Sequence, residues 1–285
     1  MKKLHIQDPE NQAIGINNYM KIPQRFTTRI DAHLLGNILN LEHFPLILAI
    51  VGKPGMGKTY QLRNYLRLLD VSIKSVSAAD LACKDAGEPA KLLQQKYIEA
   101  SALISEGTPA VLLVDDIDTT LGEWENYTGT VNHHALLAFL MHIADNPCYI
   151  ESIGPLNRVP IFFTGNNFNL LYKPLIRYGR AQRFDWEPSR EEKLPILNSI
   201  FLFDDYQNAE KLVDAFPNAT IAFFSSLKSR IEIEELTKLN ELLILKKLLT
   251  DKNYLQSVQE NYYKQSKSLS WDTIINEYLN DKIAE

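Results

Sequence analysis

A glycine-containing loop after Val51 has the residue types needed to hold a polyphosphate. The sequence Gly52-Lys-Pro-Gly-Met-Gly-Lys58-Thr59 fits the pattern G-x-x-x-x-G-K-[ST]. Its glycines let backbone N–H groups converge on phosphate oxygens, and the N-terminus of a following helix adds a positive dipole end. Lys58 would reach the β- and γ-phosphates, and the Thr59 hydroxyl would bind Mg²⁺. The motif therefore predicts an ATP and Mg²⁺ site whose nucleotide contacts come from Gly52, Pro54, Gly55, Met56, Gly57, Lys58, Thr59 and Tyr60.

Two adjacent carboxylates follow a second apolar run. The run Val111-Leu-Leu-Val114 precedes Asp115 and Asp116, and in a parallel sheet its end would lie beside the phosphate-binding loop. Asp115 is expected to hold Mg²⁺ through water, and Asp116 to polarise the water that attacks the γ-phosphate. The alternative is a strand that ends in solvated acids. For Asp118, a helix N-cap or a loop hydrogen bond is the better explanation.

Three further polar side chains could act on a γ-phosphate. Asn166 ends the apolar stretch 159–165 and could orient the attacking water, unless the two asparagines here form only a turn. Arg177 and Arg180 lie three residues apart. If subunits form a ring, these arginines could reach the γ-phosphate of a neighbour, whereas a solvated face is the ordinary alternative.

Basic and histidine residues elsewhere in the chain are further candidates for binding roles. Lys228 and Arg230 begin a long helical segment and could contact the phosphates from above. The leucines that follow are more typical of a core than of a client groove. His133 and His134 are adjacent, so their side chains would point apart on a helix, and no acidic residue has ligand spacing. We therefore expect no metal beyond nucleotide-bound Mg²⁺.

Strands and helices alternate along the part of the chain that carries these residues. Apolar runs predict strands within 46–51, 72–76, 110–118, 159–167 and 182–186. Helical patterns separate them over 28–41, 59–69, 89–106, 131–144 and 170–178. This alternation predicts an α/β fold with a parallel sheet and right-handed crossovers.

After Pro188 only helices are predicted. One opens at Ser189, and others cover 208–215, 225–249 and 271–281. We therefore expect an N-terminal linker and helix over residues 1–44, a nucleotide-binding α/β subdomain over 45–187, and a small all-helical lid over 188–285.

Composition fits a globular protein. The 285 residues are 45% hydrophobic and 23% charged, and the net charge of −5 gives no sign of a nucleic-acid partner. Cys83 and Cys148 lack C-x-x-C spacing and fit free thiols. No apolar run approaches a membrane span, and the first residues lack the apolar core of a secretory signal. A cytoplasmic location is expected.

Taken together, these residues resemble AAA+ ATPases, and within that superfamily the Rubisco activases. The likeness extends from about Tyr19 to the C-terminus and rests on strings that are not general to AAA+ proteins. These strings are Ala86-Gly-Glu-Pro-Ala-Lys-Leu92, Ile143-Ala-Asp-Asn-Pro147, Arg158-Val-Pro-Ile161, Thr164-Gly-Asn166, Pro174-Leu-Ile-Arg-Tyr-Gly-Arg180, Phe184-Asp-Trp-Glu-Pro-Ser-Arg190 and Leu212-Val-Asp-Ala-Phe-Pro217.

The resemblance implies an AAA+ P-loop ATPase that forms a ring, expected to be a hexamer, and acts on the large subunit of Rubisco. It would use ATP to release inhibitory sugar phosphates from Rubisco active sites, in a bacterial cytosol and in possible association with carboxysomes. The resemblance also implies residue roles. Tyr19 and Ile22 would lie in the adenine pocket, Asn166 would be sensor 1, and Lys228 or Arg230 would be sensor 2. Arg177 and Arg180 would be arginine fingers that act in trans on a neighbouring subunit, and the segments 82–88 and 122–129 would be pore loops.

Several positions depart from the family pattern. Lys228 stands where the family usually has Arg. The 122–129 segment lacks the usual run of glycines, contains Trp124 and places Tyr127 off the family's position. The plant-type N-terminal extension and the small-subunit-like tail of many cyanobacterial activases are not found, so an activase-like core is expected. A second hypothesis stays open: an AAA+ switch or adaptor that binds ATP and holds another protein or a nucleic acid without threading it.

Overall fold

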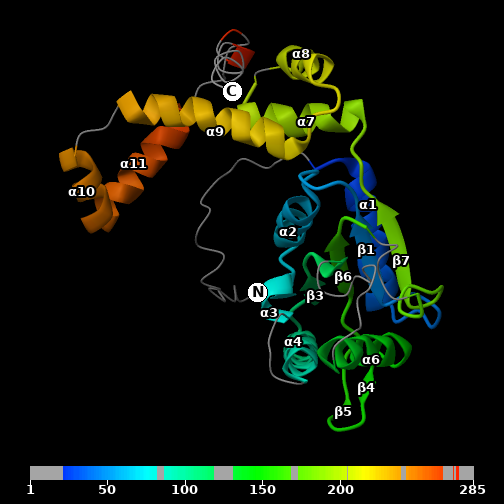
Figure 1. Ribbon diagram of the computed structural model, residues 1–285. Coiled ribbons are helices and arrows are strands. Elements are labelled where there is room, and N and C mark those ends of the chain that lie inside the picture. Colours follow the sequence, from blue (N-terminus) through cyan, green and yellow to red (C-terminus); the bar gives the residue numbers. More distant parts are fainter. Residues whose placement is uncertain are drawn as a thin grey trace. The chain divides into compact units, whose positions relative to one another are not determined.

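The structure is a computed structural model that describes residues 22–81, 87–118, 131–167, 173–203, 205–238, 242–265, 272 and 274–275. The described residues fall into two compact units, the first spanning Ile22–Ser189 and the second beginning at Arg190. Each unit is described by itself below (Figure 1). The division into 1–44, 45–187 and 188–285 stays a prediction.

A five-stranded parallel sheet forms the centre of the first unit (Figure 1). Its strand order is β2-β3-β6-β1-β7. The strands are β1 (Ile47–Val51), β2 (Ser72–Val76), β3 (Ala110–Val114), β6 (Ile161–Gly165) and β7 (Ala181–Asp185). Every residue of β1, β3 and β6 is buried, which explains why these strands appear in the sequence as unbroken apolar runs. The prediction of an α/β fold with a parallel sheet is confirmed.

Helices cover both faces of this sheet, so successive strand residues enter two different cores. On one face, Leu112 and Val114 pack with α4 (Glu88–Ser105) and α6 (Val131–Asp145). On the other, Val111 and Leu113 pack with α1 (Gln24–Ile38) and α2 (Lys58–Leu68). The alternation follows from strand geometry, in which neighbouring side chains point to opposite faces. Each polar group that follows a strand is therefore held on a rigid support.

Short elements complete the first unit and differ from the predictions. A helix α3 (Ala78–Leu81) follows β2, and β4 (Tyr149–Ile150) pairs antiparallel with β5 (Gly154–Pro155). None of these three elements was predicted. Residues 173–178 form turns and bends, where the sequence had suggested part of a helix. Pro174 lacks a backbone N–H, and Gly179 has a φ of 93°, so the chain does not continue a helix here.

The second unit is helical in its described part. Its helices are α7 (Arg190–Phe201), α8 (Gln207–Ala215), α9 (Ile221–Lys238), α10 (Leu242–Thr250) and α11 (Lys252–Gln265). The single helix predicted over 225–249 is wrong, because α9 and α10 are separate elements. No glycine or proline marks that division in the sequence. Within the described residues, no helix combines the length and the apolar character that crossing a membrane requires.

One buried histidine links α1 to the sheet. His33 lies 3.2 Å by its Nε2 from the carbonyl oxygen of Ile161 at the start of β6. Only an N–H can donate to that carbonyl, so Nε2 carries the hydrogen. Burial lowers the pKa of His33 to about 3, with smaller lowering effects from the charges of Arg29 and Arg158. The ring is therefore neutral in the folded protein at neutral pH.

This histidine predicts a loss of stability in mild acid. In the unfolded chain a histidine binds a proton near pH 6.5, whereas folded His33 takes one only near pH 3. The stabilisation that comes from neutral His33 is complete above pH 6.5 and is lost as the pH falls toward 3. The free energy of unfolding should therefore fall by about 2 kcal/mol between pH 7 and pH 5. Urea unfolding of the wild type and His33→Gln at both pH values measures it. Exposed His43→Gln is the control, and an equal pH dependence in all three proteins would contradict the prediction.

Candidate nucleotide-binding site

The phosphate-binding loop connects β1 to α2 and is shaped by its glycines. Gly57 has a φ of 76°, in the left-handed region, and directly precedes α2, which begins at Lys58. At Gly52, a Cβ atom would lie 2.1 Å from the carbonyl oxygen of Trp186, so only glycine fits. The indole N–H of Trp186 donates to the carbonyl of Met56 at 3.0 Å. Trp186, just after β7, thus supports the loop, a role that the sequence did not reveal.

Lys58 is held at the point where the loop meets the end of β6. Its Nζ donates to the carbonyls of Gly52 and Lys53, at 2.7 and 3.1 Å, and to Asn166 Oδ1 at 3.1 Å. Burial lowers the pKa of Lys58, while the negative charges of Asp116, Asp118 and Asp115 act in the opposite direction. The structure therefore brings together the predicted phosphate-binding lysine and the predicted sensor asparagine.

Asp115 and Thr59 lie side by side, as the predicted Mg²⁺ site requires. The Thr59 hydroxyl donates to Asp115 Oδ1 at 2.7 Å, and the Thr164 hydroxyl donates to the same oxygen. Arg63 Nη2 lies 3.5 Å from Asp115 Oδ2. A hydroxyl and a carboxylate are hard oxygen ligands of the kind that Mg²⁺ prefers, so these residues fit the ion. The described residues contain no group of three or more His, Cys, Asp or Glu able to hold a metal alone; phosphates and water would complete the shell.

Thr164 and Arg63 were not predicted as site residues. The position of Thr164 at the site is a result of the strand order, because β6 lies next to both β1 and β3. Arg63 is four residues after Thr59 on α2, a spacing that places both on one helix face. That spacing was the one signal in the sequence that could have indicated Arg63.

Asp116 has an unusual backbone and an unusual pKa. Its φ of 50° lies in the left-handed region, which costs energy for a residue with a side chain. Its backbone N–H donates to the Thr164 hydroxyl at 3.3 Å. Burial, followed by the charges of Asp115 and Asp118, raises the pKa of Asp116, and Lys58 opposes this. A carboxylate with a raised pKa accepts a proton more readily, as a general base must.

Asp118 ties the end of β3 to the end of β6. Its Oδ2 accepts hydrogen bonds from the backbone N–H groups of Asn166 and Asn167, at 2.8 and 2.9 Å. The loop hydrogen bond predicted as one possible role for Asp118 is confirmed. Because Asn166 in turn accepts from Lys58, Asp118 fixes the backbone from which that contact is made.

The two arginines of the predicted finger pair differ sharply in environment. The Arg180 side chain is only 11% exposed; its Nε and Nη2 contact the two Asp145 carboxylate oxygens at 2.7 and 2.5 Å, and Nη1 donates to the Pro174 carbonyl at 2.7 Å. The hydrogen bond from Arg180 lowers the pKa of Asp145. Arg177 is 61% exposed and lies 3.8 Å from Asp145. Arg177 is thus the more accessible of the two.

Some predicted residues cannot be placed at the site. Tyr19, the segment 82–86 of the first pore loop and the whole 122–129 segment with Trp124 and Tyr127 lie outside the described residues. Ile22 packs at the edge of the core that contains α1 and α2. Lys228, on α9 of the second unit, pairs with Glu232 at 3.4 Å, and Arg230 lies on the same helix. Their sensor roles stay predictions.

Comparison with known proteins agrees with this geometry. Residues 48–188 match the family described as "ATPase family associated with various cellular activities (AAA)". The phosphate-binding loop and the strand β3 that ends in Asp115 and Asp116 lie within that range, and so does the parallel sheet except for Ile47, the first residue of β1. The chain therefore belongs to the AAA ATPases.

Within this class, the chain is similar to ribulose bisphosphate carboxylase/oxygenase activases. It is 43% identical over 226 residues to the protein of Anabaena sp., with 75% of this chain and 54% of the relative covered. It is 41% identical over 221 residues to the Nostoc sp. protein, with 74% of this chain and 53% of the relative covered. Identity to the chloroplastic protein of Spinacia oleracea is 39% over 227 residues, covering 76% and 48%. The chain spans about half the length of these relatives. The resemblance to Rubisco activases is confirmed.

Proposed function

We propose that the chain is an ATP-driven remodelling ATPase that releases inhibitory sugar phosphates from the active sites of Rubisco. The observation that carries the proposal is the convergence of Lys58, Thr59, Asp115 and Asn166 at the carboxyl ends of β3 and β6. Similarity to activases over three quarters of the chain supports the client. The cyanobacterial relatives support a bacterial cytosolic location, and association with carboxysomes would follow from the location of the client.

Nucleotide binding is assigned to the loop and to the N-terminus of α2. Backbone N–H groups and Lys58 would bind the phosphates, and Tyr19 and Ile22 would contact the adenine. Thr59 and Asp115 would hold Mg²⁺, which neutralises charge on the β- and γ-phosphates when bound. Lys228 or Arg230 would contact the phosphates from the helical unit.

Hydrolysis is assigned to Asp116 and Asn166. Water attacks the γ-phosphorus, the bond to the β–γ bridging oxygen breaks, and ADP and phosphate leave. Asp116 polarises the water and accepts its proton, and Asn166 orients it. Arg177 and Arg180 would stabilise the charge from the neighbouring subunit of a ring, which we propose is a hexamer. The 82–88 and 122–129 loops would then contact the client in the axial channel.

Substitutions of the two adjacent carboxylates, Asp115 and Asp116, are expected to have different effects. Asp116→Asn should bind ATP and Mg²⁺ normally, because Asp115 and Thr59 are unchanged, but turnover should fall by about 10²-fold to 10⁴-fold as the base is lost. Asp115→Asn should weaken Mg²⁺-dependent nucleotide binding itself. Nucleotide titration with and without Mg²⁺, compared with turnover, separates the two. Identical behaviour of both variants would refute the division of roles.

The proposed function is tested on Rubisco blocked by a tight sugar phosphate. Adding the protein with ATP should restore carboxylation, whereas Asp116→Asn or a non-hydrolysable ATP analogue should not. ATP hydrolysis should also rise when blocked Rubisco is added. If hydrolysis occurs but no Rubisco form is reactivated or stimulates it, the client assignment is wrong and the AAA+ switch or adaptor becomes the better hypothesis.

A further inference from the structure

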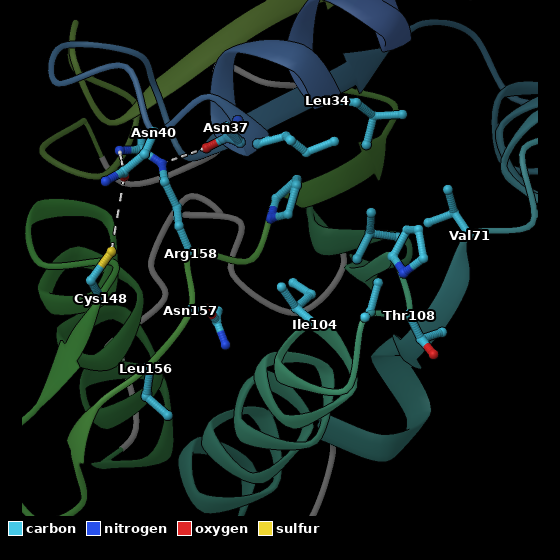
Figure 2. Close-up of a pocket in the computed structure, with 16 residues that line it drawn as sticks. Leu34, Asn37, Asn40, Val71, Ile104, Thr108, Cys148, Leu156, Asn157 and Arg158 are labelled. Atoms are coloured by element: carbon cyan, nitrogen blue, oxygen red, sulfur yellow. Dashed lines mark hydrogen bonds between the residues drawn. The ribbon is translucent and has the colours of Figure 1, made fainter.

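A cavity of about 520 Å³, whose lining residues are drawn in Figure 2, lies at the amino-terminal edge of the sheet. Its walls include Val71, which precedes β2, the first residues of β3, and Pro160, which precedes β6. The nucleotide residues, in contrast, follow the carboxyl ends of these strands. The volume lies within the range of small-molecule sites, and the cavity belongs entirely to the first unit.

The walls of the cavity are mainly apolar. The apolar side chains come from α1, the end of α4 and the strand edges, and include Leu34, Ile38, Val71, Ile104, Val111 and Leu156. The described residues that line it include one cation, Arg158, and no Asp or Glu. Figure 2 shows the Arg158 side chain extending toward Asn37 and Asn40, with Leu34, Ile104 and Val71 farther along the cavity. The site therefore combines an apolar body with a positive charge at one side.

Arg158 is held rigidly, but only by neutral groups. Its Nε donates to Asn37 Oδ1 at 2.8 Å, and its Nη1 lies 3.5 Å from Asn40 Oδ1 and 3.4 Å from the Leu41 carbonyl. Its Nη2 donates to the Phe44 carbonyl. These contacts use four of the five N–H groups of a guanidinium, so one on Nη2 remains for a further acceptor.

A partly buried cation of this kind favours an anionic ligand. No carboxylate of the described chain forms an ion pair with Arg158, and burial lowers its pKa. A charge that loses water without gaining a counter-ion is unfavourable, and a bound anion would compensate it through a charge-assisted hydrogen bond. One charge and one remaining N–H suit a monoanion, whereas a dianionic phosphate would need more donors.

We propose that this cavity binds a small monocarboxylate with an apolar body, such as a medium-chain fatty acid. The carboxylate contacts Arg158, and the apolar chain lies among Leu34, Val71 and Ile104. The lining residues form no hydrogen bond with the phosphate-binding loop within the described part of the chain, so ligand binding can be measured separately from ATP hydrolysis.

The test is calorimetric titration of the whole protein with octanoate, and with octanamide and acetate as matched probes. Octanoate should bind about fivefold to tenfold more tightly than neutral octanamide, because a charge-assisted hydrogen bond is roughly twice as strong as a neutral one. Acetate, which lacks the apolar body, should give no measurable heat. Equal affinity for octanoate and octanamide, or no heat with octanoate at millimolar concentrations, would overturn the proposal.

Variants locate the binding. Arg158→Gln should remove the preference for octanoate over octanamide, but it also loses contacts to Leu41 and Phe44 and could unfold. Ile104→Phe therefore serves as a second variant, since it fills the cavity and leaves Arg158 unchanged. It should weaken octanoate binding by about tenfold or more. Ile153→Phe, on an exposed residue outside the cavity, is the control. Unchanged binding by folded Ile104→Phe would place octanoate elsewhere and refute the site.

Discussion

Replacing Lys58 with alanine is expected to remove nearly all ATP turnover. Lys58 Nζ is fixed by two loop carbonyls and by Asn166, so its charge already lies where the loop meets the sheet edge. Loss of one such preorganised charge lowers turnover by about 10²-fold to 10³-fold, and weaker nucleotide binding adds to the effect. Phosphate release and nucleotide titration measure the two contributions separately.

Lys53 provides a matched control in the same loop. Its side chain is 67% exposed and pairs with Glu187 at 2.7 Å on the surface. Exposed ion pairs contribute little to stability, so Lys53→Ala should keep its fold and most of its turnover. If Lys58→Ala, with a normal unfolding profile, hydrolyses ATP as fast as Lys53→Ala, the loop is not the phosphate site.

Arg177→Ala is expected to lower turnover by about 10³-fold to 10⁵-fold while nucleotide binding by each subunit stays nearly unchanged. The reason is that the Arg177 side chain is 61% exposed, so that in the ring proposed above it would be able to reach the phosphates of a second subunit. Mixing Arg177→Ala with Lys58→Ala should restore part of the activity, since an intact arginine can then face an intact loop. No recovery in mixtures shown to co-assemble would mean that Arg177 acts within its own subunit or only in structure.

Asp145 distinguishes a finger role for Arg180 from a positioning role. Its carboxylate accepts two hydrogen bonds from Arg180, and Arg180 would have to give these up to reach a neighbour. If Arg180 is a finger, Asp145→Asn should keep turnover, because it weakens the contact that holds the arginine back. If the Arg180–Asp145 pair instead positions the turn that carries Arg177, Asp145→Asn and Arg180→Ala should both lose turnover. Mixing either variant with Lys58→Ala should then still restore part of the activity.

The strands of the sheet were predictable because burial on both faces leaves a direct trace in the sequence. The predicted strand over 72–76 matches β2, and the runs that contain β1, β3 and β6 were each recognised. The phosphate-binding loop was equally accessible, since its glycines and lysine are set by local geometry. In these cases the deciding interactions lie within a few residues of one another.

Interactions between distant segments were not predictable in the same way. The contact of Thr164 with Asp115 depends on β6 lying beside β3, and the Arg180 ion pair depends on a turn meeting the end of α6. Arg158 appeared in the sequence only as part of a family string, while its partners are at the end of α1. The helix α11 was not predicted, because it is polar for most of its length. Its start is marked by Asp251, whose carboxylate accepts hydrogen bonds from the N–H groups of Asn253 and Tyr254.

The position of β1 between β6 and β7 has a consequence for how the protein is made. Ile47 pairs with Ile161 on one side and with Ala181 on the other, so β1 gains its first sheet partner only when distant residues have left the ribosome. At about 5–20 residues per second, that delay is on the order of 10 s. During this delay the backbone N–H and C=O groups of β1 and its apolar side chains stay available to other chains, and nascent polypeptides ending before β6 would be targets for chaperones or prone to aggregate.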